Sequence, residues 1–144
     1  MIKFNNCTVE FQFEFSAIAG RHMQVAITVN SNDLYTVTPT DTLVTGTKIN
    51  IELPSQIVLT FFGKNHNTDT VSDSDGNITQ DIFVKILSMS IDGFQLNEKF
   101  LHQKLKLVTV DNQEIFTAYI GFNGNITIDL SAHTVFSQYL SMNS

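Results

Sequence analysis

The sequence predicts an all-β protein, an antiparallel β-sandwich or jelly roll of about nine or ten strands. Apolar and polar residues alternate with period 2 in most segments of the chain. Turn-forming pairs recur between these segments at short, regular spacing, and no helical pattern separates them. The last observation disfavours architectures in which helices connect parallel strands.

The clearest alternation lies in Val9–Phe15, where apolar residues occupy one face and Glu10, Gln12 and Glu14 the other. Similar patterns extend along the chain. The expected strands are Val9–Phe15, Met23–Val29, Leu34–Val37, Lys48–Leu53, Gln56–Phe62, Ile82–Ile91, Leu105–Val110, Glu114–Ile120 and Asn125–Leu130.

Turn signals separate these strands. Asp92-Gly93 and Asn123-Gly124 are hairpin-type pairs, and Pro54-Ser55 ends the strand before it. The longest polar stretch, Gly63–Asp81, is expected to be a loop.

Only the C-terminal tail has helical spacing. Ser131 can cap a short helix there, and the apolar residues of 135–140 would share one face. The chain is thus expected to be one domain, residues 1–144, with an N-terminal arm at 1–8 and a tail at 131–144. We expect the tail to dock on its own sandwich; docking on a neighbour is the alternative, and the oligomeric state stays open.

Composition narrows the function classes. The chain has 144 residues, 15% of them charged, with 12 Phe and no Trp, which fits a folded domain and excludes a disordered tail. Its net charge of −6 argues against binding to a nucleic-acid backbone. No stretch has the length of a signal peptide's apolar region or of a membrane helix, so no membrane association is expected.

The sequence contains no recognised catalytic motif, so no enzyme activity is predicted. A carboxylate pair for glycoside hydrolysis stays open as an alternative, but nothing singles out two of the 14 acidic residues. The histidines (His22, His66, His102 and His133) show no metal-ligand spacing, and no nucleophile elbow, phosphate loop or dinucleotide fingerprint occurs. The single cysteine, Cys7, is expected to be a small buried apolar residue.

The polar stretch carries four carboxylates within thirteen residues, at Asp69, Asp73, Asp75 and Asp81. Carboxylate and amide oxygens suit a hard cation such as calcium. The register of an EF-hand fails, because its first and twelfth positions would fall on Val71 and Ile82. A solvated loop with a turn at Asp75-Gly76 and a metal site therefore remain the two alternatives.

Aromatic residues near expected turns offer a second kind of site. Tyr35, Tyr119 and Phe122 lie there, and exposed aromatic rings on a sandwich are a platform for sugar stacking. Most of the Phe residues fall on core-facing positions instead. Asn123 follows Phe122 in the same turn, so the candidate ligand-binding residues are Tyr119, Phe122 and Asn123.

Two stretches together carry a family resemblance. The first runs from Leu59 through the acidic loop to Gly93, and the second comprises Tyr119–Gly124 with the strand after it. Their order resembles small β-sandwich proteins of tailed phages, especially marine phages of cyanobacteria. Those proteins in turn resemble calcium-dependent carbohydrate-binding modules of the xylan-binding type. The resemblance covers Leu59–Leu130, about half of the chain.

This resemblance implies a jelly-roll sandwich with calcium in the acidic loop. Carried onto this chain, the calcium ligands would be Asp69, Asp75 and Asp81, with Asn77 supplementary. In the modules, calcium itself contacts sugar hydroxyls, so sugar binding would be bridged by the metal.

The resemblance also implies a role. The leading expectation is a non-enzymatic virion protein, an accessory or decoration sandwich on the head (capsid) or tail, made in the host cytoplasm and contacting other virion proteins. The alternative is a calcium-dependent module that binds a host glycan.

Overall fold

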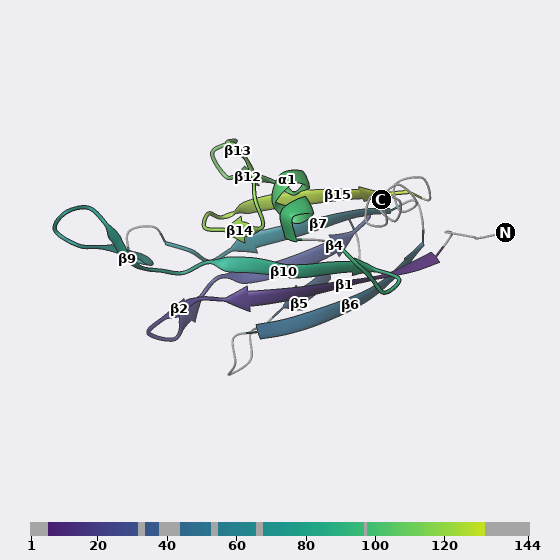
Figure 1. Cartoon of the computed structure of the whole chain (residues 1–144), viewed down its shortest axis with the longest axis horizontal. Coiled ribbons are helices and arrows are strands. Elements are labelled where there is room, and N and C mark those ends of the chain that lie inside the picture. Colours follow the sequence, from purple (N-terminus) through teal and green to yellow (C-terminus); the bar gives the residue numbers. More distant parts are fainter. Residues whose placement is uncertain are drawn as a thin grey trace.

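The computed structural model describes residues 6–31, 34–37, 44–52, 55–65, 68–96 and 98–131. These residues form two antiparallel sheets packed face to face, with short hairpins at the ends (Figure 1). The predicted all-β sandwich is confirmed. The C-terminal helix that the tail pattern allowed falls on residues 132–144, which lie outside the described part of the chain.

The first sheet has the order β11-β10-β1-β6, and β14 pairs with the other end of β10. The central strand β1 contacts β10 and β6 along nearly its whole length. The strands are β1 (Asn6–Phe15), β6 (Val44–Glu52), β10 (Val84–Ile91), β11 (Phe94–Gln95) and β14 (Tyr119–Ile120).

The second sheet has six strands in the order β13-β12-β15-β7-β4-β5. Its middle is the pair β7 and β15, which lie side by side although they are far apart in the sequence. The strands are β4 (Gln24–Val29), β5 (Leu34–Val37), β7 (Ser55–Phe62), β12 (Lys106–Thr109), β13 (Glu114–Phe116) and β15 (Gly124–Leu130).

The apolar core lies between the two sheets. Phe11, Phe13 and Phe15 point inward from β1 and are almost fully buried, as their alternation predicted. The rings of Phe11 and Phe13 stack, with centroids 5.8 Å apart. From the facing sheet, Ile27 and Leu59 complete the same core. Each such side chain contributes roughly 1.5–3 kcal/mol through burial, so the core is the main source of stability.

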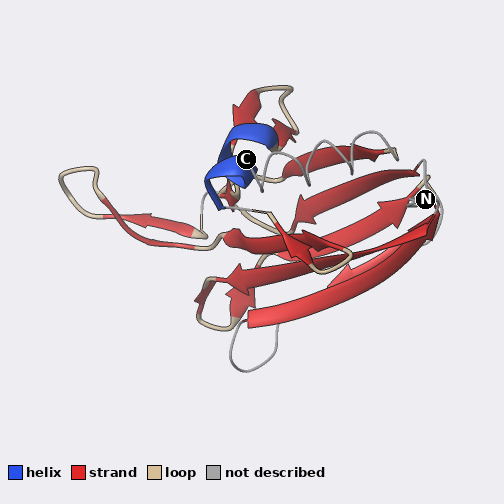
Figure 2. Cartoon of the chain, turned by 45° about the vertical axis from the view of Figure 1, so that its right-hand side comes forward, coloured by secondary structure: helices blue, strands red, loops and turns tan. Residues whose placement is uncertain are grey.

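Four features of the fold depart from the sequence prediction, and the first two concern a helix and the N-terminal arm. A helix, α1 (Glu98–Lys104), forms outside the tail, the one segment with helical spacing (Figure 2). Its seven residues are too few to show a helical repeat, and it is held by the buried Leu101. Residues 6–8 of the expected N-terminal arm belong to β1, because they pair with β6.

The expected loop at Gly63–Asp81 also contains regular structure. β8 (Thr70–Ser72) and β9 (Ile78–Asp81) form a hairpin that projects from the sandwich (Figure 1). A second small hairpin, β2 (Ala17–Ile18) with β3 (Arg21–His22), lies nearby. From Val71 to Gln80 every side chain is exposed, so the hairpin buries no face and leaves no alternating apolar signal.

The expected strand Glu114–Ile120 is two strands in different sheets. β13 pairs with β12 in the second sheet, whereas β14 pairs with β10 in the first. The chain crosses at Thr117 and Ala118, where the Ala118 N–H donates to His102 Nδ1 on α1. This crossing brings Tyr119 to the edge of the first sheet.

Gly124 begins β15 at a point of close backbone approach. A Cβ at this position would lie 2.4 Å from the Val108 carbonyl oxygen and 2.9 Å from the Thr109 Cα. We expect Gly124→Ala to lower the free energy of unfolding by about 1–3 kcal/mol, since the neighbouring backbone must move. Gly46→Ala is the matched control, because its Cβ would have only an ordinary contact of 3.7 Å. Equal urea midpoints for the two variants would contradict this prediction.

Candidate functional site

One end of the sandwich gathers the polar segments of the chain. The β8–β9 hairpin, the β2–β3 hairpin and β14 all lie at this end (Figure 1). The residues that follow β7 reach the same place, because Lys64 bonds to both Asp81 and Gly121. We call this region the loop end.

A buried ion pair lies at the centre of the loop end. Lys64 Nζ is 2.6 Å from Asp81 Oδ1, and the Lys64 side chain is 2% exposed. The same ammonium donates to the Gly121 carbonyl oxygen at 2.7 Å. The Thr70 hydroxyl donates to Asp81 Oδ1 at 2.7 Å, so the base of the hairpin is tied to the same point.

Asn123 fixes the backbone of Lys64. Its Oδ1 accepts from the Lys64 N–H at 3.1 Å, and its Nδ2 donates to the Lys64 carbonyl oxygen at 2.8 Å. The amide thus mimics a strand partner and joins the β14–β15 turn to the end of β7. Asn123 was expected to bind ligand, and here its side chain bonds to the protein itself.

A second ion pair lies at the base of the hairpin. Asp69 is buried, and its Oδ1 is 2.8 Å from Arg21 Nε on β3. Its Oδ2 accepts from the Asn65 N–H at 2.9 Å. These bonds hold the pKa of the Asp69 carboxyl below its ordinary value, chiefly through the Asn65 N–H and then through Arg21.

Asp73 closes the tip of the hairpin. Its Oδ1 accepts from the N–H groups of Asp75 and Asn77, both at 2.9 Å. Its carbonyl oxygen accepts from the Gly76 N–H, and Gly76 has a φ of +86°. An aspartate that accepts from backbone N–H groups ahead of it is a common turn stabiliser. The turn expected at Asp75-Gly76 is therefore present.

The four expected calcium ligands lie in two places. Asp69 and Asp81 are at the base of the hairpin, whereas Asp75 and Asn77 are at its tip, about 10 Å away along the strands. Among the residues that the structure describes, no three His, Cys, Asp or Glu side chains are grouped closely enough to hold a metal ion.

The base of the hairpin does not fit a calcium ion as it stands. Each carboxylate there already has a positive atom within 2.8 Å, from Lys64 or from Arg21. A divalent cation next to either carboxylate would be repelled by that positive group. The pattern of acidic residues alone could not reveal these ion pairs. Arg21 lies outside the polar stretch Gly63–Asp81, and Lys64 lies at its start.

Beside Asp81, aromatic rings form an exposed platform. Phe83 stacks on Tyr119, with ring centroids 4.5 Å apart, and Lys85 Nζ lies 5.6 Å from the Phe83 centroid. Tyr119 is 40% exposed. Burial, and then the Asp81 charge, raise the pKa of the Tyr119 phenol, which therefore stays protonated at neutral pH. We call Phe83, Tyr119 and Lys85 the aromatic platform.

The sequence predicted one member of this platform. Tyr119 was expected from its place near a turn, whereas Phe83 and Lys85 were not singled out. Phe122, also expected, is 48% exposed in the turn before β15. Tyr35 lies on β5 in the other sheet, and no described contact links it to the platform.

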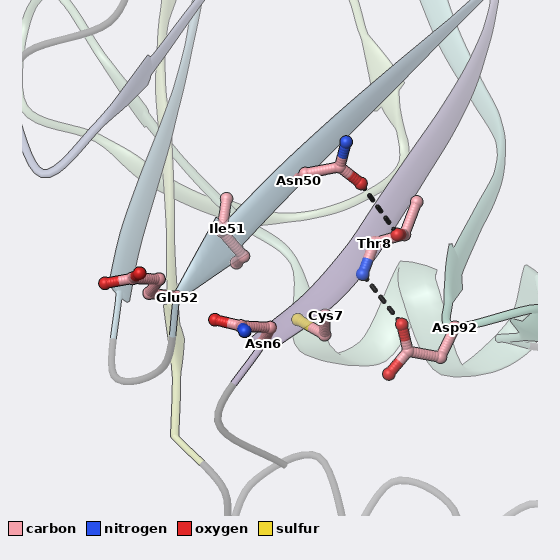
Figure 3. Close-up of a pocket in the computed structure, with 7 residues that line it drawn as sticks. All are labelled: Asn6, Cys7, Thr8, Asn50, Ile51, Glu52 and Asp92. Atoms are coloured by element: carbon pink, nitrogen blue, oxygen red, sulfur yellow. Dashed lines mark hydrogen bonds between the residues drawn. The ribbon is translucent and has the colours of Figure 1, made fainter.

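A hollow lies around one end of β1 and β6 (Figure 3). It has a volume of about 420 Å³ and is lined largely by polar side chains, including Glu52 and Asp92. The Thr8 N–H donates to Asp92 Oδ1 at 2.7 Å, and the Thr8 hydroxyl donates to Asn50 Oδ1 at 2.8 Å. Cys7 also lines this hollow and is buried, as its sequence position predicted.

We expect Cys7 to be unreactive in the native protein. Burial, with a smaller effect of Asp92, raises the pKa of its thiol to about 11. At pH 8 only about one thiol in a thousand would then be the reactive thiolate. Labelling with iodoacetamide at pH 8 should be at least tenfold slower for the native protein than for the protein in guanidinium chloride. Equal rates would contradict the buried, protonated thiol.

We expect Asp69→Asn to destabilise the protein at neutral pH and progressively less in acid. A carboxyl whose pKa is lowered by folding stabilises the folded state above its unfolded pKa, near 3.8. That contribution disappears as the pH falls below 3.8 toward the folded pKa. Urea unfolding from pH 7 to pH 2.5 measures the difference, with Asp75→Asn at the exposed tip as control. A difference that does not shrink in acid would contradict this assignment.

None of the described helical residues forms a segment long and apolar enough to cross a membrane.

The sequence was compared with protein families and with curated proteins. No protein-family model matches it, and no curated protein matches it.

Two solved structures resemble this chain. One is vCBM60 in complex with galactobiose, with a TM-score of 0.52 and 13% identity, covering 85% of this chain and 97% of that one. The other is a selenomethionine form of vCBM60, with the same TM-score of 0.52 and 13% identity, covering 88% of this chain and 96% of that one. Its description refers to two families of calcium-dependent carbohydrate-binding modules linked by circular permutation. The chain therefore has a β-sandwich fold similar to that of calcium-dependent carbohydrate-binding modules.

Proposed function

We propose that this protein is a carbohydrate-binding module without catalytic activity, which binds sugar at the loop end. The observation that carries the proposal is the likeness to vCBM60, which extends over 97% of that chain. A likeness over nearly a whole binding module supports a binding role more than it supports the purely structural virion role.

The aromatic platform supplies the apolar part of such a site. One face of a hexose ring is lined by C–H groups, and aromatic side chains in binding sites supply apolar area with fixed geometry. The Phe83 ring lies against Tyr119, with centroids 4.5 Å apart, so the tyrosine is held in place while 40% of it is exposed. A sugar ring placed on Tyr119 would bury this area without ordering a flexible side chain.

Polar groups for sugar hydroxyls surround the platform. Asp81 uses its Oδ1 for Lys64 and Thr70, and its side chain is 17% exposed, so a sugar hydroxyl can approach the solvent-facing part of the carboxylate. The Tyr119 hydroxyl both donates and accepts. The Lys85 ammonium can donate from the side of Phe83. A few convergent polar groups around an apolar surface are typical of small-molecule sites.

The location in a phage particle, the contacts with virion proteins and the host glycan as ligand rest on the sequence resemblance. We keep them as a proposal: a sugar-binding sandwich on a head or tail would attach the particle to its host. Mass spectrometry of purified particles tests the location, and absence of the protein would remove it.

The binding proposal predicts the effect of removing the platform ring. Tyr119→Ala should weaken binding to the recognised sugar about tenfold or more, which corresponds to ~1.4 kcal/mol or more. Affinity gel electrophoresis against a panel of polysaccharides identifies the ligand class, with galactobiose as the first soluble probe in calorimetry.

Tyr35→Ala is the matched control, because Tyr35 is equally exposed, at 41%, but lies on the other sheet. It should leave both affinity and stability nearly unchanged. If the Tyr119 and Tyr35 variants bind equally well, the platform is not the site. If the wild-type protein retards on no polysaccharide and binds no soluble sugar, the proposed function is wrong.

A further inference from the structure

We propose that Lys64 acts as a built-in cation for the loop end, and that this module needs no calcium to order its acidic loop. The corollary, that sugar binding is also independent of calcium, rests on the proposed function.

The surroundings of the Lys64 ammonium resemble those of a bound cation. It lies 2.6 Å from a carboxylate oxygen of Asp81 and 2.7 Å from the carbonyl oxygen of Gly121. Its side chain is 2% exposed, and a buried ammonium is tolerated only when such oxygens compensate for lost water. Two oxygens that would attract a free cation at this point, Asp81 Oδ1 and the Gly121 carbonyl oxygen, are therefore already paired with the ammonium.

The ammonium also connects the segments that an ion in this place would have to connect. Lys64 follows β7, Asp81 ends β9, and Gly121 lies in the turn before β15. Asn123 adds two hydrogen bonds from that turn to the Lys64 backbone. Three segments that are distant in the sequence thus meet at one positive charge.

Two of the remaining carboxylates of the hairpin, Asp69 and Asp73, have other roles. Asp69 pairs with Arg21 and accepts from the Asn65 N–H. Asp73 accepts from two backbone N–H groups in the tip. Among the described acidic residues of this hairpin, the charge at the base is thus balanced by side chains of the chain itself.

Melting of the wild-type protein tests the proposal directly. A ligand that binds the folded state raises the melting temperature by mass action. We expect the midpoint in 5 mM calcium chloride and in 5 mM EDTA to agree within about 1 °C. Calorimetric titration with calcium should show no saturable heat. A rise of several degrees with calcium, or a saturable heat, would overturn the proposal.

Lys64→Ala tests whether the positive charge is what matters. Removing one partner of a buried pair leaves Asp81 uncompensated, so we expect a fall in the midpoint of roughly 5–10 °C. Propylammonium, which replaces the missing atoms together with their charge, should restore part of this loss, whereas propanol should not. Equal rescue by both compounds would mean that Lys64 acts only through packing, and rescue by neither would count against a role for the charge at this point.

Two further variants complete the design. Lys106→Ala removes an exposed ion pair, in which Lys106 Nζ lies 3.5 Å from Glu114 Oε1. This variant should shift the melting midpoint little, and propylammonium should not raise it. If Lys64→Ala does not fold, Lys64→Met replaces that variant in the stability comparison. Methionine keeps an apolar chain of similar length without the charge, and we expect it to lower the melting midpoint by a similar amount.

Sugar binding is then measured in EDTA and in calcium. Equal affinities support the corollary, whereas binding only with calcium overturns it. Absence of binding in both buffers contradicts the proposed function but leaves the melting experiments to decide the role of Lys64.

Discussion

A lysine ammonium shielded from water needs oxygen atoms around it, and this requirement organises the loop end of the molecule. The aliphatic part of Lys64 is buried where the end of β7 meets the hairpin, and its charge is compensated by Asp81 and the Gly121 carbonyl oxygen. Burial, and then the charge of the same carboxylate, raise the pKa of the Tyr119 phenol. The hairpin, the turn before β15 and the aromatic platform therefore share one electrostatic centre, and a change at that centre would affect all three.

The sequence predicted the parts of the fold in which one side chain in two is buried. β1 is the clearest case, since Phe11, Phe13 and Phe15 alternate with polar residues because one face of the strand meets the core. The β8–β9 hairpin could not be found in this way, because its side chains from Val71 to Gln80 are all exposed. Nor could the change of sheet between Phe116 and Tyr119, since an alternating pattern does not say which sheet a strand joins.

The candidate site shows the same limit more strongly. The acidic run indicated where negative charge accumulates. Whether a carboxylate there can bind a metal ion depends on the groups paired with it, and some of those groups lie far away in the sequence. Arg21 is 48 residues from Asp69, and Gly121 is 57 residues from Lys64. Asp73 illustrates the opposite case: its role in the turn is local, and a turn at Asp75-Gly76 was correctly expected. A turn formed by neighbouring residues could be predicted from the sequence. The ion pairs and hydrogen bonds between distant residues could be found only from the three-dimensional structure.

A cation that belongs to the chain and one that is bound from solution stabilise loops by different rules. A bound ion contributes according to its concentration relative to its dissociation constant, so the loops loosen when the ion is scarce. An ammonium on a side chain is present in every molecule, and its contribution depends on how well the surrounding oxygens replace its lost hydration. The sandwich of this chain is similar to that of vCBM60 at 13% identity, so a similar fold does not require the same polar residues at its end. A lysine in place of an exchangeable ion would keep the aromatic platform in position whatever the ionic composition outside the protein.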